Sequence, residues 1–183
     1  MCDVEGALPV SARQELRDSL YKDSDSFISK IPKVELHVHI EGTITPELKW
    51  KFSQRNGQVL QHPRTGKIFS TLEEFKESHD PMKDHDGDRM NNSEETLSFF
   101  EAYYGGFEVL KTKQDYYDLA MHYFERAAAM NVRYCEVFFD PQGHTRIGTA
   151  WETMMTGFCE AQARAEKDLN VSDMCVPFCT VTD

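Results

Sequence analysis

One short stretch near the N-terminus constrains the fold of this chain more than any other part of the sequence. Over residues 34–40 (Val-Glu-Leu-His-Val-His-Ile), apolar side chains alternate with glutamate and histidine. A period of two is typical of a β-strand, in which successive side chains point to opposite faces. Beyond Gly42 the apolar residues adopt the wider spacing of amphipathic helices. The main fold is therefore expected to begin with a strand that leads into helices.

The remaining sequence predicts further helices and strands in alternation. N-cap residues, apolar stripes and terminal glycines predict helices over 11–22, 45–57, 72–77, 93–104, 113–130 and 150–168, the last entered through a capping box from Thr149 to Glu152. Residues 132–139 predict a second strand, and a third is due after Asn170, although Pro177 argues against it. This β-α series predicts an α/β fold with a parallel sheet and helices on its outside.

The pattern divides the chain into three segments. Residues 1–30 are expected to form an N-terminal helical extension, 31–171 the main α/β unit, and 172–183 a tail of different character. Within the main unit, residues 58–92 are polar and contain prolines and glycines, so we interpret them as a long excursion interrupted by one short helix.

Charge and cysteine content exclude several classes of protein. The 183 residues include 20 basic and 31 acidic side chains, a net charge of −11, without a cluster of lysines or arginines. This balance argues against nucleic-acid or membrane-surface binding, and no apolar run is long enough to predict a membrane span. The cysteines are odd in number and irregularly spaced, as expected of reduced thiols. We therefore expect a cytoplasmic protein.

His37 and His39 form the sharpest candidate site. Side chains at positions i and i+2 of a strand share one face about 6.6 Å apart. Two imidazoles at that spacing can converge on one divalent ion, such as Zn²⁺ at about 2.0 to 2.1 Å. By the same alternation, Glu35 and Glu41 are expected on this face. Burying such a set would be costly unless a cation or hydrogen bonds neutralised it.

A half-exposed strand with polar residues on its wet face is the simpler interpretation of the same pattern. A catalytic zinc site also needs a third protein ligand, which this strand cannot supply. The other histidines of the chain are candidates: His62, His79, His85, His122 and His144. His144 alone follows a predicted strand directly, although its Gly-His-Thr context is more typical of a surface loop, and His122 on a helix is more typical of a satisfied, partly buried residue.

Several stretches of the sequence resemble the adenosine/adenine deaminase family of metal-dependent hydrolases. The likeness is carried by 31–43 (Ile-Pro-Lys-Val-Glu-Leu-His-Val-His-Ile-Glu-Gly-Thr), by 99–110, by 117–120 and by 137–145, and covers about 31–171. The resemblance implies a (β/α)8 barrel of the TIM type, here an incomplete N-terminal portion of two to three strands with their helices.

The resemblance also implies a reaction and roles for particular residues. The reaction is hydrolytic removal of the 6-amino group of a purine, adenosine or adenine, by water that Zn²⁺ activates. His37 and His39 match the first two zinc ligands, and Glu41, together with His39, would contact the small-molecule substrate. The general acid/base carboxylate of the family has no match in this sequence, so no catalytic residue is assigned.

The chain is shorter than the fold that this resemblance implies. A (β/α)8 barrel typically needs about 250 residues, and the later metal and catalytic motifs of the family are not found here. We therefore expect the chain as given to be catalytically incomplete and to self-associate through exposed barrel edges. Two alternatives remain open: a non-catalytic product that binds metal weakly or pairs with another chain, and a different amidohydrolase chemistry on the same barrel.

Overall fold

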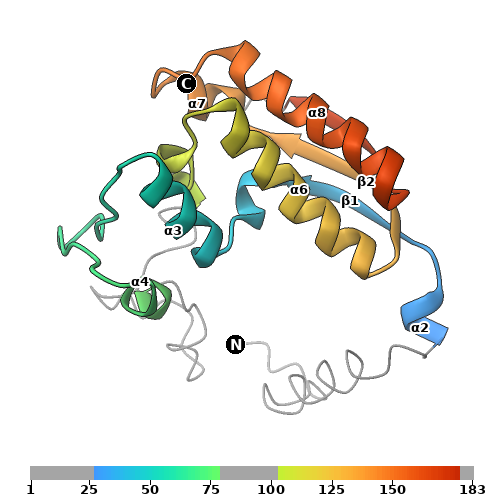
Figure 1. The fold of residues 1–183 in the computed structure, drawn as a ribbon, viewed down its shortest axis with the longest axis horizontal. Helices are drawn as coiled ribbons and strands as arrows, with labels where there is room; N and C mark the ends of the chain where they lie inside the picture. Colours follow the sequence, from blue (N-terminus) through green and yellow to red (C-terminus); the bar gives the residue numbers. More distant parts are fainter. Residues whose placement is uncertain (1–26, 79–102, 178–183) are drawn as a thin grey trace, which may run out of the picture.

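The structure is a computed structural model that describes residues 27–78 and 103–177 (Figure 1). In chain order the elements are α2 (Phe27–Lys30), β1 (Lys33–His39), the 3-10 turn η1 (Ile40–Thr43), α3 (Pro46–Arg55), α4 (Leu72–Ser78), the 3-10 turn η2 (Phe107–Val109), α6 (Lys113–Ala129), β2 (Val132–Phe139), α7 (Pro141–Thr145), α8 (Trp151–Leu169) and β3 (Ser172–Pro177). The helix predicted over 11–22 and most of the one over 93–104 lie outside the described residues.

The three strands form one parallel sheet in the order β1-β2-β3, as the β-α pattern predicts. Helices α6 and α8 lie side by side across one face of this sheet (Figure 1). Between the helices and the sheet lies the core, which includes Cys135, Val137 and Phe139 of β2 and Ala127 and Ala161 of the two helices. This strand-helix repeat, with helices on one face of a parallel sheet, is consistent with part of a (β/α)8 barrel.

Strand β1 departs from the regular alternation that the sequence predicts. Its pairing with β2 is irregular between Glu35 and Val38, and His37 between them has a left-handed backbone φ of 60°. Glu35 therefore faces α6, where its carboxylate accepts a hydrogen bond from the Tyr123 hydroxyl at 2.8 Å. The expectation that Glu35 shares the face of His39 was wrong, because the irregularity shifts the alternation between them.

The third strand forms despite Pro177. Residues Ser172–Pro177 pair in parallel with β2, and Pro177 is the last residue of β3. Proline is tolerated on a strand that has a paired neighbour on one side only, as β3 has in the described sheet. The prediction that Pro177 argues against a third strand was therefore wrong, because this proline ends the strand and does not interrupt it.

Close packing joins the two covering helices. A Cβ atom on Gly157 of α8 would lie 2.5 Å from the carbonyl oxygen of Lys113 and 2.7 Å from the Cβ of Tyr116, both on α6. Only glycine allows the helices this approach. Within the part of the chain that the structure describes, no helix is long and apolar enough to cross a membrane.

A buried carboxylate fixes α3 against the start of α6. Asp115 is fully buried, pairs with Arg55 at the end of α3, and accepts hydrogen bonds from Asn56 and from the backbone N–H and hydroxyl of Thr112. Burial acts to raise the pKa of Asp115, but these hydrogen bonds outweigh it and hold the pKa below its ordinary value. Asp115 therefore ties the C-terminal end of α3 to the N-terminal end of α6.

Candidate functional site

His37 and His39 lie at the carboxyl end of β1, on the sheet face away from α6 and α8. Their imidazole rings are 5.4 Å apart between centroids. Both rings contact Phe138 of β2, at 4.7 Å from His37 and 5.9 Å from His39. The two imidazoles are therefore brought together on one face, supported by an aromatic ring on the neighbouring strand.

Glu41 follows in η1 and is almost completely buried. Its Oε1 atom accepts the backbone N–H of Asp140 at 2.8 Å and lies 3.0 Å from Nε2 of His144. Its Oε2 atom lies 3.4 Å from the hydroxyl of Tyr103. Oε1 of Glu41 thus makes two polar contacts within the protein, whereas Oε2 points toward Tyr103 and His39.

His144 does not lie in a surface loop. It belongs to α7 and is wholly buried, with its ring 4.5 Å from that of Phe107. Since a carboxylate can only accept, Nε2–H of His144 donates to Glu41, and Nδ1 accepts from the Tyr116 hydroxyl at 3.0 Å. Both ring nitrogens are engaged, so His144 holds Glu41 and does not offer a third metal ligand.

Tyr103 and Asp140 complete the cluster, and sequence reasoning missed both. The Tyr103 hydroxyl lies 2.8 Å from Oδ2 of Asp140 and 3.3 Å from Nδ1 of His39. Burial, the nearby carboxylate of Glu41 and the hydrogen bond to Asp140 raise the pKa of Tyr103, so it remains a hydroxyl donor. Asp140 directly follows β2, the position where barrel enzymes assemble their sites, and that signal could have found it.

The remaining histidines lie elsewhere. His62 is buried, and its Nδ1 accepts the backbone N–H groups of Arg64 and Thr65, each at 3.3 Å. His122 is partly buried on α6, as predicted, but its Nε2 has no hydrogen-bond partner among the described residues, and burial lowers its pKa. His79 and His85 lie outside the described residues. Over 27–78 and 103–177, no group of three or more His, Cys, Asp or Glu side chains is placed to hold a metal ion.

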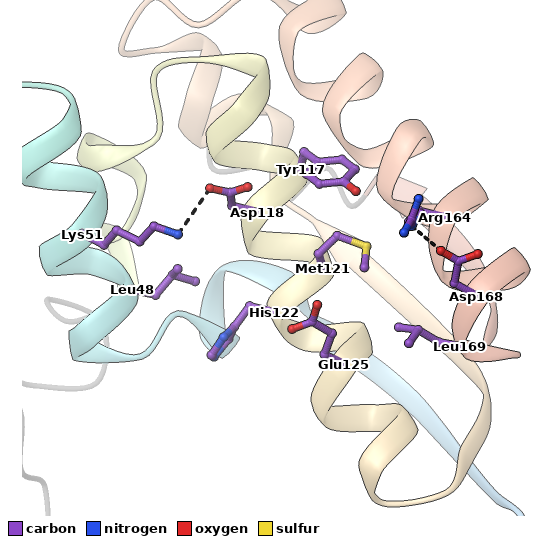
Figure 2. Close-up of a pocket in the computed structure, with 10 residues that line it drawn as sticks. All are labelled: Leu48, Lys51, Tyr117, Asp118, Met121, His122, Glu125, Arg164, Asp168 and Leu169. Atoms are coloured by element: carbon purple, nitrogen blue, oxygen red, sulfur yellow. Dashed lines mark ion pairs between the residues drawn. The ribbon is translucent and has the colours of Figure 1, made fainter.

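A separate pocket of about 410 Å³ lies on the outer side of α6, between α3 and α8 (Figure 2). Two ion pairs lie at its wall: Lys51 of α3 pairs with Asp118 of α6 at 3.7 Å, and Arg164 pairs with Asp168 within α8 (Figure 2). Its lining is Leu48, Lys51, Tyr117, Asp118, Met121, His122, Glu125, Arg164, Asp168 and Leu169. This pocket is distinct from the candidate site at the strand ends, because its lining includes none of the residues of that site: His37, His39, Glu41, Tyr103, Asp140 and His144.

Comparisons with known proteins agree on one family. Residues 32–182 match the family described as "Adenosine deaminase". An adenine deaminase of Rhodospirillum rubrum is 42% identical over 147 residues, which are 80% of this chain and 38% of that protein. The chain thus spans about 38% of the length of this curated relative.

Solved structures give the same picture. The crystal structure of an adenine deaminase from Arthrobacter aurescens is 37% identical, with a TM-score of 0.64 over 81% of this chain and 39% of that one. An amidohydrolase from Burkholderia ambifaria, solved with bound Zn, has a TM-score of 0.63 at 21% identity over 95% of this chain and 40% of that one. The second likeness concerns the fold alone.

Proposed function

Because the chain belongs to the adenosine deaminase family, we propose that it serves zinc-dependent hydrolytic deamination of a 6-aminopurine. The observation that carries this proposal is the convergence of His37, His39 and Glu41 at the carboxyl ends of β1 and β2. Adenine is favoured over adenosine, since a similar curated protein and a similar solved structure are both adenine deaminases.

His37 and His39 are the residues proposed to hold the metal ion. Imidazole nitrogens are ordinary zinc ligands, and the two rings lie close enough to serve one ion. Catalytic zinc usually takes three protein ligands, so the rest of the donor set would come from outside the described residues. When bound, zinc supplies the Lewis acidity that makes water a nucleophile near neutral pH.

The chain's own residues would bind and orient the substrate. His144 and the backbone N–H of Asp140 hold Oε1 of Glu41, so the Oε2 atom is the one that could accept a hydrogen bond from a purine N–H or a nucleoside hydroxyl. The Tyr103 hydroxyl lies near both Nδ1 of His39 and Oε2 of Glu41, so His39 faces the same side of the site. His39 is therefore proposed to contact the substrate as well. No residue of the chain is proposed as the general acid/base.

Zinc content and turnover test this function together. The purified chain is expected to retain zinc, measured by mass spectrometry, and to lose it in His37→Ala and His39→Ala but not in the control His122→Gln, which lies on α6. Deamination of adenine or adenosine would be monitored through the change in ultraviolet absorbance during incubation. Turnover that His37→Ala leaves untouched would contradict the assigned site.

A second candidate function is pairing with another chain, without catalysis and with weak metal binding through His37 and His39. Its support is the exposure of two apolar side chains of β1, Val34 at 61% and Leu36 at 59%. Strand β1 lies at the margin of the described sheet, where its outer edge can pair with another strand. Sedimentation of the wild type and of Val34→Lys/Leu36→Lys tests this alternative: loss of a dimer in the variant supports pairing, and a monodisperse monomer that deaminates adenine with added zinc contradicts it.

A further inference from the structure

The ring orientation of His39 depends on a hydroxyl and a carboxylate that come from two other parts of the chain. Tyr103 precedes η2, and Asp140 follows β2. We infer that Tyr103 and Asp140 form a positioning pair that keeps the proton of His39 on Nδ1 and so leaves the lone pair on Nε2. The inference rests on the proposed function only in treating His39 as a metal ligand.

Hydrogen-bond chemistry around the Tyr103 oxygen decides the direction of each contact. The oxygen lies 2.8 Å from Oδ2 of Asp140, 3.4 Å from Oε2 of Glu41 and 3.3 Å from Nδ1 of His39. A phenol has one hydrogen to donate, and carboxylates only accept. The shortest contact, to Asp140, takes that hydrogen. Of the three neighbours, His39 alone can donate back to the Tyr103 oxygen, and it does so through Nδ1–H.

A second, independent observation comes from the other oxygen of Asp140. Oδ1 is buried and has no hydrogen-bond partner among the described residues, yet it lies 3.9 Å from Nδ1 of His39. Its negative charge favours a proton on the nearer ring nitrogen. The Asp140 carboxylate is in turn fixed, because its own backbone N–H is bound by Glu41 and its Oδ2 by Tyr103.

This arrangement has a defined consequence for metal binding. Metal-binding histidines usually donate their second N–H to a carboxylate or another acceptor, which fixes the tautomer and makes the free nitrogen a better ligand. Loss of such a partner typically lowers metal affinity about 10- to 100-fold. Tyr103 and Asp140 would therefore prepare His39 before any metal arrives.

Nitrogen-15 NMR of the metal-free, histidine-labelled 183-residue chain tests the tautomer directly. The spectra would be recorded above about pH 7.5, where imidazole is neutral, and His39→Gln would assign the signals. His39 is expected to show a protonated Nδ1 and an unprotonated Nε2. Tyr103→Phe should abolish this preference, whereas Tyr104→Phe, which removes a neighbouring and more exposed hydroxyl, should preserve it. A proton on Nε2 in the wild type, or an unchanged tautomer in Tyr103→Phe, would overturn the inference.

Zinc affinity, measured by competition with a chelating indicator, separates this inference from the proposed function. Tyr103→Phe is expected to weaken binding about 10- to 100-fold, and Tyr104→Phe to leave it unchanged. Equal affinity in wild type and Tyr103→Phe would reject the pair as a positioning device. A wild type that binds no zinc, with the expected tautomer in the NMR spectrum, would reject the proposed function and retain the positioning pair.

Discussion

Nε2 of His144 lies 3.0 Å from Oε1 of Glu41, and both side chains are fully excluded from solvent. Removing one member of a buried, hydrogen-bonded pair that includes a charge typically costs about 3 to 5 kcal/mol, because the other is left buried and uncompensated. His144→Leu is therefore expected to lower the free energy of unfolding by about that amount, as measured by urea denaturation.

The matched variants are His144→Gln and His144→Asn. The longer glutamine side chain can place its amide N–H near the position of Nε2, whereas the shorter asparagine reaches only the position of Nδ1, which faces Tyr116. Glutamine should recover more of the lost stability than asparagine. Equal losses in the two variants would show that the contact to Glu41 contributes little.

Gly157 sets how closely α6 and α8 approach. A methyl group there would overlap the backbone of Lys113, which cannot move as the end of a side chain can. Gly157→Ala is expected to destabilise the chain by about 1 to 3 kcal/mol, the usual cost of overpacking, despite the higher helix propensity of alanine. Cys159→Ala, at an exposed position of α8, is the control and should leave the stability nearly unchanged. A rise in the melting temperature of Gly157→Ala would contradict the close approach.

Asp115 makes stability depend on pH in the acid range. Its pKa is lowered in the folded chain, so its stabilising contribution is complete above the unfolded-state pKa, about 3.9, and is lost as pH falls through the lower folded-state value. In Asp115→Asn that part of the pH dependence should disappear. Denaturant titrations of both proteins between about pH 2 and 6 measure the difference. Parallel curves would show that the folded and unfolded pKa values are the same.

Lys49 gives a pH dependence of the opposite kind, in the alkaline range. Burial lowers the pKa of Lys49 from 10.5 to about 8, and its ammonium group lies 5.5 Å from the ring centroid of Phe75. Between these two pH values the unfolded chain holds a proton that the folded chain has released, so the free energy of unfolding rises with pH. Relative to Lys49→Met, the wild type should gain up to about 3 kcal/mol. A constant difference between the two proteins from pH 7 to 10.5 would contradict the lowered pKa.

The order of elements was largely predictable because it follows from local signals. The strand over 132–139 matches β2 residue for residue. The N-cap residues from which the helices over 45–57 and 113–130 were predicted, Thr45 and Thr112, cap α3 and α6 through their side chains. The capping box at Thr149 was wrong. Ala150 precedes the first turn of α8 without a side-chain hydrogen bond, while Thr149 is buried beside Tyr116. Tertiary packing outweighed the local preference there.

The candidate site was predictable only in the part that one strand supplies. His37 and His39 were found from their spacing, but their contacts to Phe138 and Tyr103 join residues far apart in sequence. The role of His144 was also hidden, because its glycine and threonine neighbours look like a surface turn. Gly143 is in fact required by packing, since a Cβ atom there would lie 2.8 Å from the ring of Phe107.

The left-handed backbone of His37, at φ 60°, sets the stability of the fold against the proposed binding of metal. A residue other than glycine in this conformation costs about 1 to 3 kcal/mol. Glycine would remove that cost and, with it, an imidazole that the proposed metal site needs. A laboratory selection for heat resistance alone is therefore expected to discard His37 early, so any engineering of this chain must screen for bound metal and for melting temperature in the same round.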